Sequence, residues 1–203
     1  MEALINQPMY IFIKDLATVI LTIWGLIIAG RGLATWKKQI TGVKEFETAY
    51  NLRYSILKLR DSIKHVRNPA IWPSESQKAT KYAEAKYPEK IGGDLGSGSH
   101  PYVYEMRWEE IVTSSTEMES HLLAAEVLWG PEVLKLIKPL NKKITELNIC
   151  LKQYFEPDFR TQSLEKLRKV IYDMSGEDAK DEFSLEIEKT IKAIVEYIKD
   201  RIS

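Results

Sequence analysis

The chain has 203 residues, of which 44% are apolar and 29% charged, and its 29 basic and 29 acidic residues leave a formal net charge of zero. This length and apolar content are ample for a folded domain with a buried core, which excludes a disordered chain. The single cysteine, Cys150, excludes a disulfide scaffold. The balanced charge excludes a uniformly basic nucleic-acid coat and an acidic tail protein.

The first predicted element is an apolar run near the N-terminus. Residues 16–30 (LATVILTIWGLIIAG) carry no charge, but a helix over them extends only about 22 Å. The twenty residues from Ile11 to Gly30 extend about 30 Å, which matches the hydrocarbon core of a bilayer. Lys14 and Asp15 then lie in the outer zone of the bilayer, where a charge costs less than at the centre. We therefore expect a transmembrane helix over residues 11–30, within an N-terminal segment of residues 1–35.

Two other interpretations of this run remain. It could be the buried core helix of a soluble domain, although residues 16–29 lack the polar face of such a helix. A cleaved signal peptide would begin with positive charges, whereas Glu2 is the only charged side chain in residues 1–13.

The residues around the run predict its orientation. Four basic residues follow it, whereas Lys14 is the only one on its N-terminal side; the four are Arg31, Lys37, Lys38 and Lys44. The positive-inside rule places the N-terminus outside and the bulk of the chain in the cytoplasm, at the inner membrane of a cell. The four basic residues are expected to face anionic lipid. Gly25 and Ala29, four residues apart, would let two spans pack closely, so we expect a homo-oligomer.

Residues 36–67 predict a basic, helical juxtamembrane stem. Its apolar residues follow alternating steps of three and four, as in a heptad seam: Ala49, Leu52, Ile56, Leu59, Ile63 and Val66. Residues 31–70 hold nine basic and three acidic residues, a net charge of +6. Beyond a Debye length of about 8 Å the attraction to lipid fades, so Arg53 to Arg67 need other partners. We expect acidic helices of the same chain, and keep an outside anion as the alternative.

The remainder of the chain predicts a helical bundle. Asn68-Pro69 ends the stem, and residues 68–101 are expected to form a long loop, with a short helix over 80–87 and a Gly/Ser cluster over 92–99. Further helices are expected over 102–129, over 131–155 with a kink or break at Pro139, over 164–174 and over 179–202. No run of alternating polarity predicts a strand. The expected fold is all-α, with a transmembrane helix that continues through the stem into a cytoplasmic bundle of residues 102–203.

Several short segments carry a resemblance. They are Trp36-Lys37-Lys38-Gln39-Ile40, Glu45-Phe46-Glu47, Lys58-Leu59-Arg60-Asp61, Val66-Arg67-Asn68-Pro69 and Leu128-Trp129-Gly130. On these segments the chain resembles uncharacterised bacterial proteins that have one N-terminal membrane span followed by a helical cytoplasmic region. The resemblance implies the same topology, and it implies no activity or catalytic residue.

The sequence contains few residues for metal or cofactor chemistry. One cysteine and three scattered histidines cannot form a zinc motif, and no Glu-x-x-His pair is present for a di-metal bundle. No phosphate-binding loop ending in Lys-Ser/Thr occurs, and no G-x-S-x-G elbow. We therefore expect no metal and no cofactor.

One pattern does point to catalysis. Arg60 and His65 are separated by four residues, which resembles the motif of HEPN ribonucleases, helical bundles that use this Arg and His, often across a dimer, to cleave RNA. Histidine would transfer a proton and arginine would stabilise the phosphorane charge. The other interpretation is a solvated basic helix face.

The leading functional expectation is a non-enzymatic, self-associating interaction module anchored at the inner membrane, acting as adaptor, sensor or effector. Its partners would be the lipid bilayer, a second copy and a protein. The alternative is a membrane-tethered HEPN-like ribonuclease or nucleotide-responsive defence effector that uses Arg60 and His65. A third possibility is an oligomeric pore or channel regulator, although the span offers only Thr18 and Thr22 as hydroxyls.

Overall fold

The fold is built from helices alone over the part of the chain that is described. The computed structural model describes residues 2–89, 96–156, 158, 160–174 and 181–201, and these contain helices and no strand. This confirms the all-α prediction. The chain divides into two units, Met1–Phe46 and Glu47–Ser203, and the second unit contains the helical bundle.

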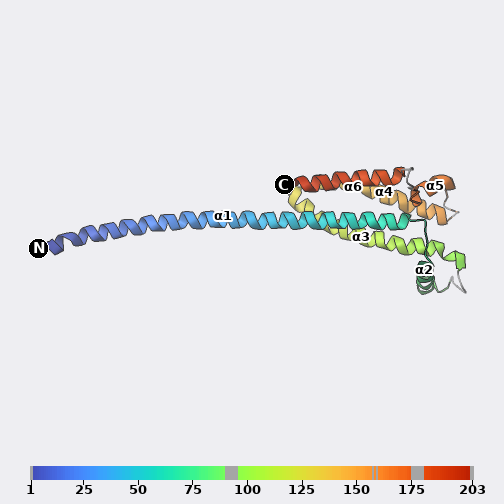
Figure 1. Cartoon of the computed structure of the whole chain (residues 1–203), viewed down its shortest axis with the longest axis horizontal. Helices are drawn as coiled ribbons and strands as arrows, with labels where there is room; N and C mark the ends of the chain where they lie inside the picture. The colour runs from blue at the N-terminus through green and yellow to red at the C-terminus, as the bar shows by residue number, and fades with distance from the viewer. Residues whose placement is uncertain (1, 90–95, 157, 159, 175–180, 202–203) are drawn as a thin grey trace. The chain divides into compact units, whose positions relative to one another are not determined.

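The longest element is helix α1 (Glu2–Arg67), with 66 residues (Figure 1). The apolar N-terminal run and the basic stem are thus parts of one helix, because no proline or turn cluster interrupts residues 9–67. The helix ends at Arg67 because Asn68 precedes a proline, and the Asn68 side chain instead accepts a hydrogen bond from the amide of Ala70 at 2.9 Å.

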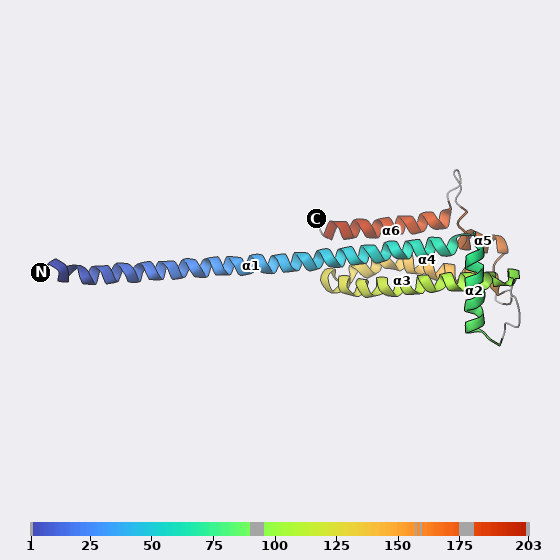
Figure 2. The same ribbon diagram turned by 60° about the horizontal axis from the view of Figure 1, so that its bottom comes forward.

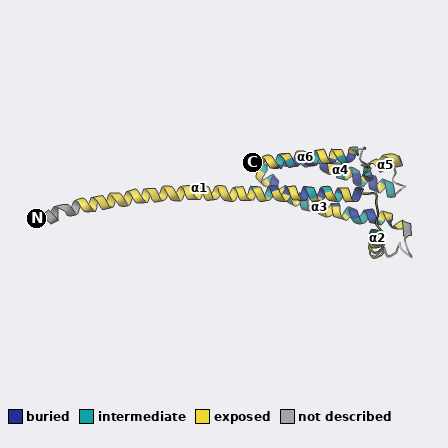
Figure 3. Ribbon diagram, viewed as in Figure 1, coloured by how far each residue is buried: buried dark blue, intermediate teal, exposed yellow. Residues whose placement is uncertain are grey.

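The heptad seam of α1 forms one wall of the bundle core. The structure confirms this prediction, because every seam residue is at most 2% exposed: Ala49, Leu52, Ile56, Leu59, Ile63 and Val66. Figure 3 shows buried residues recurring along the C-terminal part of α1, whereas the N-terminal part is exposed throughout its described side chains. Burial therefore begins where the second unit begins.

Three further long or medium helices complete the bundle, and a short one connects two of them. They are α3 (His100–Trp129), α4 (Glu132–Phe155), α5 (Leu164–Ile171) and α6 (Glu182–Arg201). Both ribbon views show α3, α4 and α6 running alongside the C-terminal part of α1 (Figures 1 and 2). Each contributes a row of side chains to one core, among them Ile111, Leu147 and Ile194. The bundle is consequently held together by burial of apolar faces.

The helix ends follow local sequence signals. Gly130 adopts φ +83°, a conformation that favours glycine, and its amide bonds to the carbonyl of Glu126 to close α3. The side chain of Ser163 caps α5 by accepting from the amide of Lys166. Helix α4 runs through Pro139 without a break, which leaves the kink as the remaining form of that prediction.

The segment 68–101 differs from the long loop that the sequence predicts. It contains helix α2 (Pro73–Lys86), which begins well before the expected short helix over 80–87, and a 3₁₀ turn at Gly96–Ser99. Pro73 occupies the first turn, where its missing N–H is harmless, and Ala79 and Ala83 are buried. Two alanines make a very weak apolar pattern, which is why periodicity did not show the whole helix. Residues 92–95 of the expected Gly/Ser cluster lie outside the described residues, and residues 96–99 form the 3₁₀ turn.

The last two helices are shorter than expected. Helix α5 ends at Ile171 rather than at 174, and α6 begins at Glu182. Residues 175–180 and Ile202, which the prediction placed at a turn and in the terminal helix, lie outside the described residues. The seam of α6 is buried as its spacing predicts, at Ile187, Ile191, Ile194 and Ile198.

Candidate functional site

Arg60 and His65 lie on the same helix and do not meet. Five residues of α-helix separate two side chains by about 140° around the axis. Arg60 forms an ion pair with its neighbour Asp61 at 2.8 Å. His65 Nδ1 lies 2.9 Å from a carboxylate oxygen of Glu110, and its Nε2 lies 3.6 Å from Glu75. Within one chain, therefore, the two residues of the HEPN-like pattern have separate partners.

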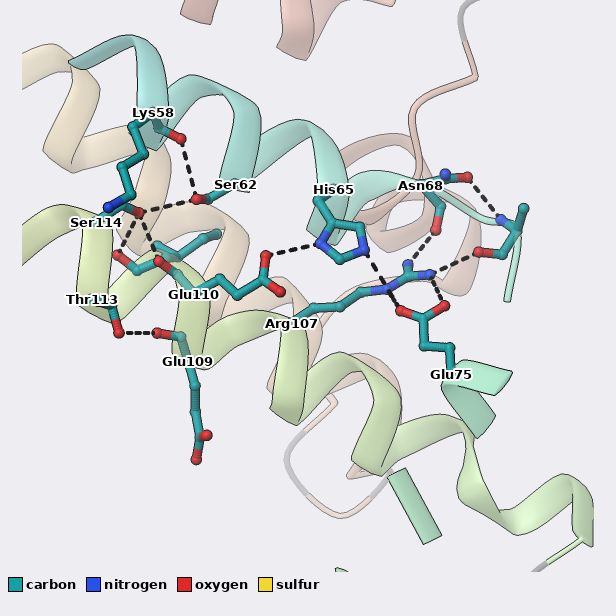
Figure 4. A network of polar contacts seen from close by, with 12 residues as sticks. Lys58, Ser62, His65, Asn68, Glu75, Arg107, Glu109, Glu110, Thr113 and Ser114 are labelled. Carbon is teal, nitrogen blue, oxygen red and sulfur yellow. Dashed lines mark hydrogen bonds and ion pairs between the residues drawn. The ribbon is translucent and has the colours of Figure 1, made fainter. Parts of the chain in front are cut away.

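The contacts of His65 belong to a polar network built on Arg107 (Figure 4). Arg107 is 1% exposed and binds both carboxylate oxygens of Glu75, through Nε at 2.6 Å and Nη2 at 2.8 Å. Its guanidinium also donates to the carbonyl oxygens of Asn68 and Ala70, at 2.6 and 2.7 Å. The network joins α2 and the segment after α1 to α3, so a large part of its role is structural.

The electrostatics of this network follow from the arginine. Hydrogen bonds from Arg107 hold the pKa of the Glu75 carboxyl below its ordinary value, against the opposing effect of burial. A bidentate Arg–carboxylate pair is the strongest ion-pair geometry in proteins. Because Glu75 is already occupied by Arg107, it is not free to act as a general base beside His65.

A second buried arginine ends α1. Arg67 is 1% exposed, pairs with Asp181 at 2.5 Å and donates to the carbonyl oxygens of Val170 and Tyr172 at 2.7 and 2.9 Å. It also donates to the hydroxyl of Ser184. Burial raises the pKa of Asp181, but hydrogen bonds from Arg67 and Ser184 outweigh this and leave the pKa below its ordinary value. Arg67 thus connects the end of α1 to the start of α6 and to the end of α5.

Sequence reasoning did not single out Arg107, and it expected Arg67 to find an acidic partner in the chain without predicting its burial. A signal existed for Arg107, because it lies three residues after Tyr104 and four before Ile111, which places a charge in an apolar stripe. Buried charges are almost always paired. The partner Glu75 could not be found in the same way, because it lies on a helix whose pattern is weak.

The basic residues of the stem divide into two groups. Of those expected to pair within the chain, Lys58 binds Glu117 on α3 at 2.6 Å and Lys64 binds Glu188 on α6 at 3.2 Å, and both pairs confirm the expectation. The residues expected to face lipid are all exposed, and no ion pair engages their side chains in the described part of the chain: Arg31, Lys37, Lys38 and Lys44. These four residues remain available to an outside anion.

The apolar run in α1 is exposed along its described length. A window of 18 residues reaches a mean hydropathy of 2.1 with none of it buried, so α1 is long and apolar enough to cross a membrane. Within this run a Cβ added to Gly25 would meet no atom within 4 Å. Gly25 therefore has no packing partner within the described residues, and Ala29 is exposed as well.

A cleft of about 600 Å³ opens between α3, α4 and the residue after α2. Its walls are largely aromatic, with Tyr87, Tyr102, Tyr104, Trp108 and Phe155. Two carboxylates line it, Glu105 and Glu156, and Glu105 accepts a hydrogen bond from Tyr87 at 2.7 Å and pairs with Lys86 at 2.9 Å. Such a cleft can hold a planar apolar group.

Metal ligands do not cluster in the described residues: no group of three His, Cys, Asp or Glu side chains could hold an ion. Cys150 is buried, and burial raises the pKa of its thiol. Such a thiol is inert.

No family model, no curated protein and no solved structure matches the chain. The geometry of the chain's own residues therefore carries the proposal that follows.

Proposed function

We propose that the protein is a single-pass, membrane-anchored helical interaction module that self-associates and acts as adaptor, sensor or effector at the inner membrane. One observation carries the proposal: α1 contains an apolar stretch long enough to span a bilayer, and none of its most apolar window is buried among the described residues. Residues 9–33 present apolar side chains of which about half or more is exposed, such as Leu21, Leu26 and Ile28.

The physical argument is the cost of this exposure. Burying a large apolar side chain is favourable by about 1.5–3 kcal/mol, so a run of exposed leucines and isoleucines in water is strongly unfavourable. A soluble core helix would bury these residues against its own domain, and none of the most apolar window is buried. A bilayer satisfies both the apolar side chains and the helical backbone.

The proposed topology places the N-terminus outside and the bundle in the cytoplasm. Its support is the asymmetry of charge around the run, with Arg31, Lys37, Lys38 and Lys44 after it and only Lys14 on the N-terminal side. Cytoplasmic basic residues near the membrane gain about 1 kcal/mol each from anionic lipid. The four side chains are exposed and unpaired within the described chain, as such contacts require.

The alternative, a HEPN-like ribonuclease or nucleotide-responsive defence effector, needs Arg60 and His65 at one phosphate. In the folded chain Arg60 is paired with Asp61, and His65 is held by Glu110. No contact among the described residues favours this alternative over the anchored module.

The anchor is tested by fractionation of cells that express the full chain. We expect the protein to remain in membranes at alkaline pH and to leave them only in detergent. Recovery as a detergent-free, monodisperse soluble monomer would overturn the proposal.

The topology is tested by labelling with a membrane-impermeant maleimide in intact cells. A Cys150→Ser background removes the native thiol, and either Glu2→Cys or Lys78→Cys is then added. The Glu2→Cys variant should react in intact cells, whereas the Lys78→Cys variant should react only after lysis. The reverse pattern would contradict the proposed orientation.

A further inference from the structure

The segment of α1 after the apolar run carries a narrow apolar stripe. The stripe consists of residues spaced by three or four positions, all between 39% and 63% exposed: Leu33, Trp36, Ile40, Val43 and Phe46. This spacing places them on one side of a helix. All five lie in the first unit, and nothing in the described part of that unit covers them.

The charged residues of the same segment avoid the stripe. By helix geometry Arg31, Lys38 and Glu45 lie on the opposite side, and Lys37 and Lys44 lie along one edge. The other edge is uncharged, with Thr35, Gln39 and Gly42. The segment is therefore amphipathic, with both edge lysines on the same side of the stripe.

The position of both lysines along one edge of the stripe favours a parallel arrangement of two identical helices. In a parallel pair of identical helices, one edge of each faces the opposite edge of the other, so Lys37 and Lys44 would face an uncharged edge. In an antiparallel pair the same edges meet, and the lysines of the two copies would repel each other. Two copies anchored in one membrane can approach only in parallel.

Small residues extend the same face into the apolar run. Steps of three and four lead back from Trp36 through Gly32 and Ala29 to Gly25, whereas Gly30 falls on another face. A glycine inside a helix costs about 0.5–1 kcal/mol relative to alanine. Gly25 and Gly32 have ordinary helical conformation and open space around them, so the folded chain itself makes no use of them. A second helix that packs closely against α1 would make use of these small residues, because they let two backbones approach.

The available area is sufficient for a specific contact. The two aromatics and three aliphatics of the stripe expose roughly 400 Å² per copy, taking full side-chain areas of about 150–250 Å² and about 100 Å². Two copies could bury at most roughly 800 Å² at the stripe, and packing along residues 25–32 would add to this toward the roughly 1,000 Å² that a specific interface needs.

We propose that a second copy of this chain packs in parallel against α1, along the face formed by Gly25, Ala29, Gly32 and the apolar stripe. The inference rests on the proposed membrane anchor, because the anchor fixes both copies in the same direction and brings them to one surface. It adds the identity of the partner, its orientation and the face that it occupies.

The test is disulfide cross-linking of the full chain in isolated membranes. In a Cys150→Ser background, Val43→Cys lies on the stripe and Lys38→Cys lies on the opposite side, five residues away. Mild oxidation should yield covalent dimer at least tenfold more efficiently for Val43→Cys than for Lys38→Cys. Equal yields, or no dimer from either, would overturn the inference and would indicate that lipid or another protein covers the stripe.

Matched glycine variants test the second half of the face. Gly25→Ile and Gly32→Ile, each combined with Val43→Cys, should reduce the dimer yield at least fivefold, whereas Gly30→Ile adds the same side chain on another face and should leave it unchanged. If the three glycine variants changed the dimer yield equally, the assignment of Gly25 and Gly32 to the contact face would be wrong. Alkaline extraction of every variant distinguishes failure of the membrane anchor from failure of the parallel dimer. Release of the protein from the membrane would contradict the anchor. Retention in the membrane without a Val43→Cys dimer would contradict the dimer alone.

Discussion

Arg67 and Arg107 are the charged side chains that the second unit buries among its described residues. Each is surrounded by a carboxylate and backbone carbonyl oxygens, so each charge is compensated at several atoms. Removal of one partner of a buried pair leaves the other charge without compensation, which is far more costly than loss of a surface pair. These two arginines are thus the most sensitive polar positions in the bundle.

Substitution of Arg107 by methionine tests this point. Arg107→Met should lower the free energy of unfolding by about 3–5 kcal/mol, because Glu75 and two carbonyl oxygens lose their donors. Lys135→Met removes an exposed ion pair with Glu132 and should change the free energy of unfolding by less than about 1 kcal/mol. Urea unfolding of the full chain in detergent measures both. The double variant Arg107→Met/Glu75→Gln should be less destabilised than the sum of the single variants.

His65 and Arg60 test the ribonuclease alternative. We expect purified wild-type protein to leave single-stranded RNA intact, and we expect His65→Ala and Arg60→Ala to leave any effect of overexpression on cell growth unchanged. The reason is that each side chain is paired with a different carboxylate in the folded chain. RNA cleavage by the wild type that both variants abolish would establish the alternative instead.

Helix α1 is continuous, but the distribution of apolar side chains around it changes along its length. Its first part is apolar on all sides, its middle is amphipathic, and its last part buries a seam in the bundle. Spacing alone predicted that seam, because a buried helix in water needs apolar residues at every turn on one face. The structure adds that Tyr50 and Tyr54, which also lie on α1, are exposed and stacked, with ring centroids 6.4 Å apart.

The seam should carry much of the stability of the bundle. Leu59→Ala should lower the free energy of unfolding by about 2–5 kcal/mol, because Leu59 is fully buried and its removal leaves a cavity. Val127→Ala shortens a side chain that is 85% exposed and should change the free energy by less than about 0.5 kcal/mol. Chemical denaturation followed by Trp fluorescence would compare the two, and equal effects would contradict the seam.

Two buried ion pairs join separate elements of the bundle, and only the second of them involves α1. Arg107 and Glu75 join α2 to α3, and Arg67 and Asp181 join α6 to the end of α1. Both carboxyls have a pKa below the ordinary values of 4.5 for Glu and 3.8 for Asp. The unfolded chain therefore binds protons at a higher pH than the folded chain does, and acid favours unfolding.

The expected pH dependence follows from the sign of these shifts. The stability contributed by the two carboxyls should be complete above about pH 5 and should fall as the pH drops through about 4.5 and below, towards the lowered pKa values. Thermal unfolding of the full chain at about pH 6, 4.5 and 3.5 measures this. Arg107→Met should lose less stability over that range than wild type, because the pKa of Glu75 is then no longer lowered by the guanidinium.

The helical class, the apolar run, the seam of α1 and most helix ends could be predicted from the sequence, because periodicity and helix-ending residues such as Asn68-Pro69 act locally. The sequence also predicted that part of the basic stem pairs with acidic helices. Which residues form these pairs became clear only in the folded chain, as did the full extent of α2 and the burial of Arg67 and Arg107. These features depend on side chains tens of residues apart in sequence, such as Glu75 and Arg107, whose meeting no local pattern encodes.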